Sequence, residues 1–540
     1  MNVDIIVIGG GHAGCEAAYA ASRFSKKVLL VTHDISSIGQ MSCNPAIGGV
    51  GKSHLVREID AMGGLMGICA DEAGIHFKVL NASKGPAVRA TRSQSDRLLY
   101  SQSVKSIINS ERSLTSISEE VVDIEIKNNK ATGVKLKNGE IISAKKIILT
   151  AGTFLNGKLF TGEEEEEGGR KKSKSSKILA NCLKSLDLGD ARLKTGTPPR
   201  ILTSSIDFSA LEVQPGDTPR PCMSFTGSPK MHPEQMNCFI TRTNSRTHEF
   251  IRSGLDRSPM FSGRIDGIGP RYCPSIEDKI HRFADKESHQ IFIEPEGHTS
   301  NEVYPNGIST SMPKDIQNKM VKSILGFEKA KITQFGYAVE YDFFDPRNLS
   351  HTLETKSIKN LFFAGQINGT TGYEEAAAQG LVAGINAVLS LESKEPWVES
   401  RANSYIGVLI DDLITLGTKE PYRMFTSRAE HRLLLREDNA DQRLTPYAHG
   451  LGIISNERWG IFQKKMTKIN SETQALERIR IDPSSFGGKT KSKQPVLSVL
   501  KRPEVKLEEI YKLVKRPLPE NSVLLDIETT EKYAGYIERQ

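Results

Sequence analysis

Short apolar runs separated by glycine-rich turns mark the strands that we expect in this chain. The first run, residues 3–8, is rich in β-branched residues and leads into a glycine-rich turn, residues 9–14, and an alanine-rich stretch, residues 15–21. A second apolar run follows at residues 28–31. Alanine favours helix, whereas short β-branched runs favour strand. The pattern therefore predicts a strand, a glycine turn, a helix and a second strand.

The glycine turn fits the pattern G-x-G-x-x-G and lies between a predicted strand and a predicted helix, as in dinucleotide-binding units. Gly9 would allow the tight turn, Gly11 would let the backbone approach a pyrophosphate, and Gly14 would let helix and strand pack closely. The phosphates would lie at the positive helix N-terminus. One departure is that the second strand ends in Thr32 and His33 rather than in an acidic residue. The alternative is a plain glycine turn in an ordinary α/β domain.

Strand patterns continue after this unit. Residues 117–126 alternate like a strand, and residues 131–136 and 141–144 predict a hairpin around Asn138-Gly139, a type I′ turn signal. Residues 146–150 form a further apolar strand. A β-meander followed by an apolar strand that ends near glycine is typical of the FAD domain in glutathione-reductase-like flavoproteins.

A second strand–glycine–helix pattern lies far along the chain. The apolar residues 360–364 precede a glycine-rich turn, residues 365–372, and an alanine-rich stretch, residues 373–380. In FAD enzymes, such a helix directs its N-terminus at the flavin pyrimidine ring, where the helix dipole stabilises negative charge. A tight turn without a ligand is the alternative.

Residues 36–53 are unlike an ordinary core segment, and their end resembles a phosphate-binding P-loop. We reject an NTPase function because Ala46 stands where G-x-x-x-x-G-K-[ST] requires glycine, and because no apolar strand precedes the loop. The loop is instead a candidate for lining a flavin. It contains Cys43, which is either a functional thiol or a buried inert one.

Several segments are rich in basic residues. Residues 81–97 and 422–436 could contact phosphates or nucleic acid, or could equally be solvated basic surfaces. Residues 163–177 place an acidic run before a basic run, which we interpret as a surface loop. Residues 241–271 are dense in arginine, and Cys273 follows them between Tyr272 and Pro274. A cysteine near arginine can have a lowered pKa and act as a nucleophile.

Composition narrows the class of protein. The chain has 540 residues, of which 38% are hydrophobic, so we expect two to four domains of a globular protein and no membrane span. The first residues already form a core strand, so no targeting peptide is expected. Seven cysteines without a C-x-x-C pair indicate reduced thiols and a cytoplasmic location. The formal charge of +7 is compatible with a polyanionic partner but does not establish one.

These motifs together resemble one family. The chain is similar to the tRNA uridine 5-carboxymethylaminomethyl modification enzymes, the FAD-binding subunits of the GidA/MnmG family. The matching blocks are residues 9–14, 39–49, 81–92, 194–200, 269–279, 365–380 and 418–441.

The resemblance implies an α/β fold: a glutathione-reductase-like Rossmann FAD domain with inserted α+β domains and a mostly helical C-terminal region. We accordingly expect residues 1–200 and 301–395 to form the FAD-binding domain. Residues 201–300 would be an inserted NAD- or substrate-binding domain, and residues 396–540 the helical region that contacts tRNA and partner. Because relatives continue beyond the position of Gln540, we expect their C-terminal helical tail to be lacking.

The resemblance also implies the activity. A homodimer would act with a GTPase of the MnmE family, as a heterotetramer with two copies of each, and without a membrane. It would add a (carboxymethyl)aminomethyl group to C5 of the wobble uridine, position 34, of certain tRNAs. The one-carbon unit would come from methylene-tetrahydrofolate, and NADH would reduce the bound FAD.

Site residues follow from the same resemblance. The implied FAD contacts are Gly9, Gly10, Gly11, His12, Ala13, Gly14, Val121, Ser176 and Gln366. The implied nicotinamide segment comprises Gly269, Pro270, Arg271, Tyr272, Cys273, Pro274, Ser275, Ile276, Glu277, Asp278, Lys279, Ile280, His281, Arg282 and Phe283. Cys43 and Cys273 correspond to the family's two candidate catalytic thiols. No metal site is predicted.

The chemistry requires a thiol because C5 of uracil is a poor nucleophile. Thiolate addition to C6 would make C5 an enolate-like carbon that can attack a one-carbon iminium. We assign this addition to Cys273 and treat Cys43 as a second thiol or a flavin-side residue, with the two roles exchangeable.

Three alternatives remain at this stage. The first is the related folate- and FAD-dependent tRNA uridine-54 methyltransferase, which lacks blocks such as residues 418–441. The second is a disulfide reductase of the same fold, which would need a redox cysteine pair that this chain does not have. The third is a non-catalytic flavoprotein that only binds tRNA or a partner.

Overall fold

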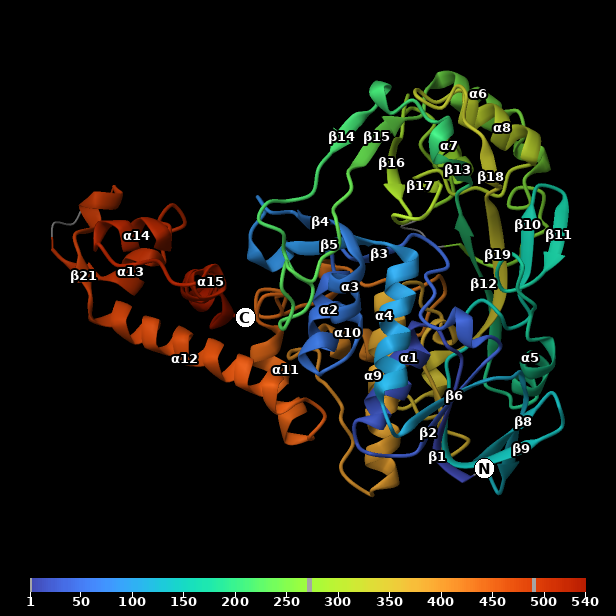
Figure 1. Ribbon diagram of the computed structural model, residues 1–540, viewed down its shortest axis with the longest axis horizontal. Helices are drawn as coiled ribbons and strands as arrows, with labels where there is room; N and C mark the ends of the chain where they lie inside the picture. The colour runs from blue at the N-terminus through green and yellow to red at the C-terminus, as the bar shows by residue number, and fades with distance from the viewer. Residues whose placement is uncertain (1, 270–273, 488–491) are drawn as a thin grey trace.

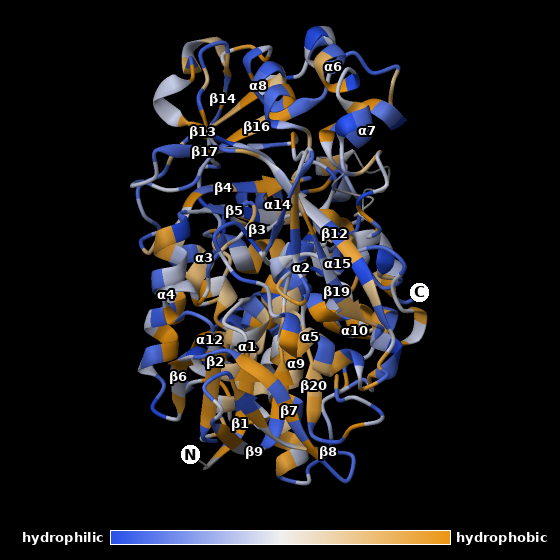
Figure 2. Cartoon of the chain, turned by 90° about the vertical axis from the view of Figure 1, so that its right-hand side faces the viewer, coloured by the Kyte–Doolittle hydropathy of each residue, from blue (hydrophilic) through white to orange (hydrophobic). Residues whose placement is uncertain are grey.

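A computed structural model describes residues 2–269, 274–487 and 492–540. Its central sheet has seven strands, six of them in the order β6 (Leu114–Ser118), β2 (Val28–Thr32), β1 (Asn2–Ile8), β9 (Ile141–Leu149), β8 (Lys130–Leu136) and β7 (Val121–Lys127). The seventh strand, β20 (Leu361–Phe363), pairs in parallel with β9. Strands β1, β2, β6, β9 and β20 pair in parallel, whereas β7 and β8 add an antiparallel meander. Figure 2 shows hydrophobic residues gathered in this layer.

The helices α1 (His12–Ser22) and α9 (Tyr373–Leu391) pack directly on each other beside this sheet (Figure 1). Glycines make this contact close. A Cβ added at Gly380 would lie 2.1 Å from the carbonyl oxygen of Ala13, and one at Gly384 would lie 2.5 Å from that of Ala17. Both predicted strand–glycine–helix units therefore belong to one domain, with their helices side by side.

Strand β9 differs from the sequence prediction. We predicted two strands at residues 141–144 and 146–150, but a single strand runs through Ile141–Leu149. Its first residues pair antiparallel with β8, and its later residues pair in parallel with β1. One strand thus belongs both to the antiparallel meander and to the parallel part of the central sheet, because β8 and β1 pair with opposite edges of it.

The inserted unit is built on a second sheet of six strands. Its order is β14 (Glu212–Gln214), β15 (Cys238–Arg242), β16 (Gln290–Pro295), β17 (Glu302–Asn306), β13 (Arg200–Leu202) and β18 (Ile332–Gln334). Helices α6 (Ser245–Arg252), α7 (Ile276–Arg282) and α8 (Lys314–Lys322) supply apolar residues to its separate core. We predicted an insertion over residues 201–300, whereas this sheet extends to residue 334.

Two smaller sheets connect these parts. In one, β12 (Asp190–Thr197) and β19 (Tyr337–Phe344) pair antiparallel between the two larger sheets, and β10 (Lys158–Thr161) and β11 (Glu164–Glu167) lie at its edge (Figure 1). In the other, β5 (Ala90–Ser95) lies between β3 (Ala46–Gly48) and β4 (Gly74–Leu80). Our prediction of a surface loop at residues 163–177 is wrong for its acidic part, which forms β11. The basic residues that follow form ion pairs with this strand, such as that of Lys171 with Glu166.

Beyond residue 400 the described chain is mainly helical, as predicted. Helices α10 (Tyr405–Asp411) and α11 (Ala440–Gly450) pack on α2 (Lys52–Ala61). The long α12 (Asn456–Arg478) leads away to α13 (Val496–Leu500), α14 (Leu507–Leu513) and α15 (Asn521–Ile537), which share a small core of their own (Figure 1). Within the described ranges, every helix is too short or too polar to cross a bilayer.

Candidate functional site

A cavity of about 790 Å³ lies at the carboxyl ends of the parallel strands. It is lined by the first glycine turn, the loop that contains Cys43, residues 150–154 after β9, residues 169–176, and the N-terminal residues of α9. Tyr304 of the inserted sheet completes part of its wall. A volume of this size suits a cofactor or a drug-sized ligand.

The first glycine turn is shaped as a phosphate site. Gly9 has φ +110°, and a Cβ there would lie 2.8 Å from the Thr150 hydroxyl oxygen. At Gly14 a Cβ would lie 1.8 Å from the carbonyl oxygen of Gly9, so only glycine allows this helix start. At Gly11 no described atom lies within 4 Å of a Cβ position, so the backbone is open to the cavity. The N-terminus of α1 therefore offers its amides to an anion in the cavity.

His12 follows this turn on the cavity wall. Its ring stacks on that of Tyr373, with centroids 4.3 Å apart, and its Nε2 is buried without a hydrogen-bond partner among the described residues. Burial lowers the pKa of His12 to about 4, so the ring is neutral at physiological pH. An unpartnered buried nitrogen beside an open cavity fits a site that a polar ligand fills.

The end of β2 also reaches the cavity. Thr32, His33 and Asp34 line it, and the carboxylate of Asp34 accepts hydrogen bonds from the Ser36 amide at 2.8 Å and the Ser36 hydroxyl at 2.6 Å. His33 Nε2 lies 3.3 Å from the Ser176 hydroxyl oxygen, at the start of α5 (Lys177–Lys184). A ribose at this position would thus meet His33 and Ser176 rather than the usual strand-end carboxylate.

Most of the predicted FAD contacts lie around this cavity. Gly9, Gly10, Gly11, His12, Ala13, Val121, Ser176 and Gln366 all line it. Gly14 is instead used in close packing beneath the turn. Val121 begins β7 and is 3% exposed, whereas Gln366 donates its Nε2 to the Tyr341 hydroxyl oxygen at 2.8 Å.

The second helix presents its N-terminus to the same cavity, as predicted. Gly372, Tyr373 and Glu374 line the wall, and Gly372 has φ +154°, which favours glycine. The Lys52 ammonium lies 2.7 Å from a carboxylate oxygen of Glu374 and 3.1 Å from one of Glu375. The lysine of the P-loop-like sequence is therefore neutralised by two carboxylates, which agrees with our rejection of an NTPase function.

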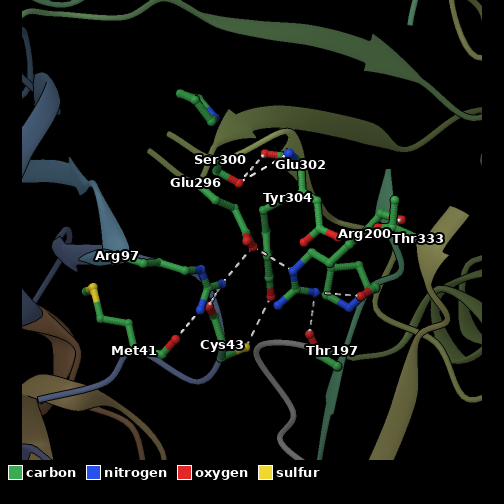
Figure 3. A network of polar contacts seen from close by, with 12 residues as sticks. Met41, Cys43, Arg97, Thr197, Arg200, Glu296, Ser300, Glu302, Tyr304 and Thr333 are labelled. Carbon is green, nitrogen blue, oxygen red and sulfur yellow. Dashed lines mark hydrogen bonds and ion pairs between the residues drawn. The ribbon is translucent and has the colours of Figure 1, made fainter. Parts of the chain in front are cut away.

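Cys43 lies on the cavity wall with its thiol turned toward the inserted sheet (Figure 3). Its Sγ is 3.1 Å from the Tyr304 hydroxyl oxygen, and its backbone amide donates to the Tyr373 hydroxyl oxygen at 2.6 Å. Its carbonyl oxygen accepts from the guanidinium of Arg97. The backbone of Cys43 is thus held by Tyr373 and Arg97, which lie outside the insertion, while its sulfur contacts Tyr304 of the insertion.

An arginine–glutamate network supports this thiol. Glu296 of the insertion accepts from Arg97 at 2.8 Å and from Arg200 at 2.6 Å (Figure 3). The Arg200 guanidinium lies 4.5 Å from the centroid of the Tyr304 ring. Arg200 and Glu296 are 5% and 6% exposed, so the attraction between their charges is little screened by water. The ion pair thereby holds Arg200 against the Tyr304 ring, beside Cys43.

Only part of the predicted nicotinamide segment lies within the described residues. Pro270, Arg271, Tyr272 and Cys273 lie outside the described residues, so the structure does not place the predicted nucleophile. Gly269 and residues 274–283 do not line the cavity. Within α7, Ile276 and Ile280 lie in the core of the insertion, and Glu277 accepts hydrogen bonds from the amide and hydroxyl of Ser311 at 3.0 and 3.2 Å.

Sequence analysis missed the residues that surround Cys43 from other elements. Tyr304 and Glu296 belong to the insertion, and their positions in sequence carry no motif. Arg97 lies in the basic segment for which we left a phosphate contact and a solvated surface open, yet it bonds to protein groups. In the segment at residues 422–436, Arg423 lines the cavity, whereas Arg428 stacks over the Tyr422 ring at 4.1 Å.

The fold and the cavity define a dinucleotide-binding α/β protein with a thiol in its binding site. The family model for glucose inhibited division protein A matches residues 4–395. The model for the C-terminal helical domain of the tRNA-modifying enzyme MnmG/GidA matches residues 456–540. The chain belongs to the GidA/MnmG family of flavin-dependent tRNA-modifying enzymes.

Solved structures of GidA from Aquifex aeolicus are similar throughout. The form II crystal structure is 44% identical with a TM-score of 0.93, and the match covers 100% of this chain and 88% of that one. The form I crystal structure is 45% identical with a TM-score of 0.93, and covers 100% and 89% respectively. The sequence resemblance and the predicted fold class are therefore confirmed.

Proposed function

We propose that the protein uses FAD and NADH to modify C5 of the wobble uridine, position 34, of certain tRNAs. The group added is a (carboxymethyl)aminomethyl group whose one-carbon unit comes from methylene-tetrahydrofolate. The observation that carries the proposal is the thiol of Cys43, which lies on the wall of the cavity where the N-termini of α1 and α9 meet. A dinucleotide site with a thiol at its wall brings a nucleophile and a hydride carrier into one cavity.

The residues of the cavity fit FAD. Gly9, Gly10 and Gly11 would hold the pyrophosphate at the N-terminus of α1, and His33 with Ser176 would meet the adenosine ribose. The N-terminus of α9 would lie at the flavin pyrimidine ring. FAD, when bound, supplies hydride transfer, with NADH as the source of the hydride.

The thiols act on the uracil ring. A thiolate forms a bond to C6, and the electron pair of the C5–C6 double bond becomes available at C5. C5 then bonds to the methylene carbon of a one-carbon iminium, formed from the folate-derived methylene and an amine co-substrate that supplies the nitrogen of the added group. C5 loses its proton, and the thiolate leaves C6 to restore the double bond. Tyr304 places a hydroxyl 3.1 Å from the sulfur of Cys43, within reach for hydrogen bonding to the thiol or thiolate.

Cys43 and Cys273 divide these roles. We assign the C6 addition to Cys273 on sequence grounds, because Arg271 lies two residues before it. Cys43 is then the second thiol at the flavin side, and the two roles can be exchanged. The assignment for Cys273 rests on sequence alone, since this residue lies outside the described part of the chain.

The proposal also includes an assembly with a partner protein. Family likeness supports a cytoplasmic homodimer that acts with an MnmE-family GTPase, two copies of each. The formal charge of +7 is compatible with tRNA as the substrate.

The test is nucleoside mass spectrometry of tRNA from cells that lack their native enzyme and express this chain. We expect restored C5-modified wobble uridine, lost in Cys43→Ser and in Cys273→Ser, with FAD content unchanged in both. Cys182→Ser is the matched control because Cys182 is half-buried, lies outside the cavity and bonds to Asp123. Full activity in both site variants would contradict the thiol assignment.

Two other outcomes would point to the alternatives. Methylation at uridine 54 in place of a wobble modification would support the methyltransferase. A reducible FAD that never turns over on any tRNA, even with the GTPase added, would support a binding subunit.

A further inference from the structure

A loop of the insertion reaches back and packs on the FAD-binding part. Residues 215–237 join β14 to β15, and their ends are tied to β4: the Asp217 amide donates to the carbonyl oxygen of Phe77 at 2.8 Å, and the Met236 amide to that of Ile75 at 2.7 Å. Figure 1 shows this long connection descending beside β4 and β5. In its middle, the loop meets α3 (Met66–Ala73) through Asp71.

Three metal-binding side chains converge at this contact. Asp71 comes from α3, and Cys222 and His232 come from the loop. The His232 Nε2 lies 3.5 Å from an oxygen of Asp71 and 3.7 Å from the sulfur of Cys222, and all three donor atoms lie within 4.8 Å of one another. Asp71 and His232 are buried, whereas Cys222 is partly exposed.

The distance between His232 and Asp71 suits a shared cation better than a hydrogen bond. A separation of 3.5 Å between nitrogen and oxygen is long for a hydrogen bond. Ligand atoms at tetrahedral angles and zinc bond lengths of about 2.0 to 2.3 Å are separated by about 3.3 to 3.6 Å. The observed spacings of 3.5 and 3.7 Å are close to this range.

The arrangement is also unlike a catalytic triad. In a triad, the acid and the nucleophile contact opposite nitrogens of the imidazole. Here, Asp71 and Cys222 face the same nitrogen of His232. With its proton on Nδ1, which has no hydrogen-bond partner among the described residues, the ring presents the Nε2 lone pair to both.

The surroundings hold these ligands in place. The His232 ring stacks on Phe77, with centroids 4.0 Å apart and an angle of 17° between the planes. The two oxygens of Asp71 accept the amides of Met223 at 2.6 Å and Ser224 at 2.9 Å, each oxygen keeping a second lone pair. Such bonds orient a carboxylate ligand.

We propose that Asp71, Cys222 and His232 form a site for a zinc-like divalent cation that ties the loop of the insertion to α3. Thiolate, imidazole and carboxylate are together the ligands that zinc accepts, and the two anionic ligands balance its charge. The partly exposed side of Cys222 leaves the fourth position to water. None of the three ligands lines the cofactor cavity, so the site is separate from the proposed reaction.

The test uses the 540-residue chain after treatment with a chelator and removal of the chelator. Cobalt(II) serves as the spectroscopic probe, since a tetrahedral site with one thiolate gives intense visible bands and a near-ultraviolet charge-transfer band. We expect one equivalent to bind, and Cys222→Ser to lose the charge-transfer band and about 100-fold or more in affinity. Cys182→Ser and Cys43→Ser should keep the band, which assigns it to Cys222.

Two further measurements distinguish the loss of a metal ligand from a folding defect in the variants. X-ray absorption of the zinc-loaded wild-type protein should show one sulfur at about 2.3 Å and nitrogen or oxygen ligands at about 2.0 Å. Zinc should raise the thermal unfolding midpoint of the wild type but not of His232→Gln. Substoichiometric binding, a zinc shell without sulfur, or a band that survives in Cys222→Ser would overturn the site. None of these results depends on tRNA modification, so the site can fail or stand independently of the proposed function.

Discussion

Substitution of Lys52 tests most directly whether a buried ion pair at the cavity wall stabilises the fold. Its ammonium lies between Glu374 and Glu375, and the side chains are 13%, 2% and 0% exposed respectively. The remaining oxygens of the two carboxylates accept the amides of Gly48 at 2.8 Å and Met424 at 2.9 Å. One ammonium thus links the Cys43 loop, the N-terminus of α9 and a C-terminal segment.

Lys52→Met removes the cation but keeps most of the apolar stem. Two neighbouring buried carboxylates are then left with backbone amides alone. Breaking a buried pair in this way costs about 3–5 kcal/mol, because the remaining charge has lost both water and its partner. We expect a loss of this size in the free energy of unfolding, and weaker retention of FAD because α9 moves at its N-terminus.

The loss should depend on pH with a definite sign. Burial opposes ionisation of Glu374, but Lys52 outweighs it and holds the pKa of this carboxyl below its ordinary value. In the wild type, this stabilisation is present at neutral pH and disappears as pH falls through the lowered pKa. The difference between wild type and Lys52→Met should therefore be largest at neutral to alkaline pH and shrink in acid.

The measurement is denaturant unfolding of the FAD-free proteins followed by circular dichroism, with Lys145→Met as the control. Lys145 forms a similar pair with Asp4 at 2.8 Å, but its side chain is 61% exposed. That exposed pair should contribute only about 0–1 kcal/mol. Lys52→Met combined with Glu374→Gln should recover part of the loss. A Lys52→Met protein no less stable than the Lys145→Met protein would refute the reasoning.

Other expectations follow from the same geometry. Gly380→Ala places a Cβ 2.1 Å from the carbonyl oxygen of Ala13 and should lower stability by about 1–3 kcal/mol and reduce bound FAD, measured by thermal melting and the flavin-to-protein absorbance ratio. Gly460→Ala is its control: it lies in α12 with nothing within 4 Å and should be neutral or stabilising by up to about 1 kcal/mol. Burial keeps the pKa of His12 at about 4, so the unfolded chain binds this proton first and stability should fall as pH drops from about 6.5 to 4. In His12→Asn, the pH slope of unfolding free energy in this window should fall by up to about 1.4 kcal/mol per pH unit, and an unchanged slope would show that the folded ring is protonated. Tyr304→Phe removes the hydroxyl 3.1 Å from Cys43 and should slow alkylation of Cys43 at neutral pH by several-fold without loss of FAD, as followed by mass spectrometry; an unchanged rate would show that Tyr304 does not act on the thiol.

Local patterns were enough to predict the two glycine turns and their helices. Gly14 is required by its contact with Gly9, five residues earlier, so the spacing within the turn already carries this geometry. Gly9 and Gly380 meet Thr150 and Ala13, which are distant in sequence, so only the fold explains why these two positions need glycine. The strand at residues 141–149 was harder to predict, since Lys145 and Lys146 interrupt its apolar residues and we interpreted the two sides as separate strands. Which residues pair with β8 and which with β1 depends on neighbours distant in sequence.

The surroundings of Cys43 show the same limit at the candidate site. The sequence marked the loop that holds this cysteine but left open whether its thiol was functional. Tyr304, Glu296 and Arg200 come from an insertion whose sheet ends at residue 334, and no spacing rule connects them to residue 43. The cluster of Asp71, Cys222 and His232 was missed for this reason too, because Asp71 lies far from the other two in the chain.

The sequence by itself determined the class of cofactor site, the order of its strands and helices, and the family. Those features depend on glycine positions and apolar periodicity, which act within one turn or one strand. Only the tertiary structure decided which charges are neutralised and what the Cys43 thiol contacts. Lys52 resembles a phosphate-binding lysine in the sequence, yet in the fold it balances Glu374 and Glu375. Electrostatic and hydrogen-bonding partners act through space, and folding alone brings them within range.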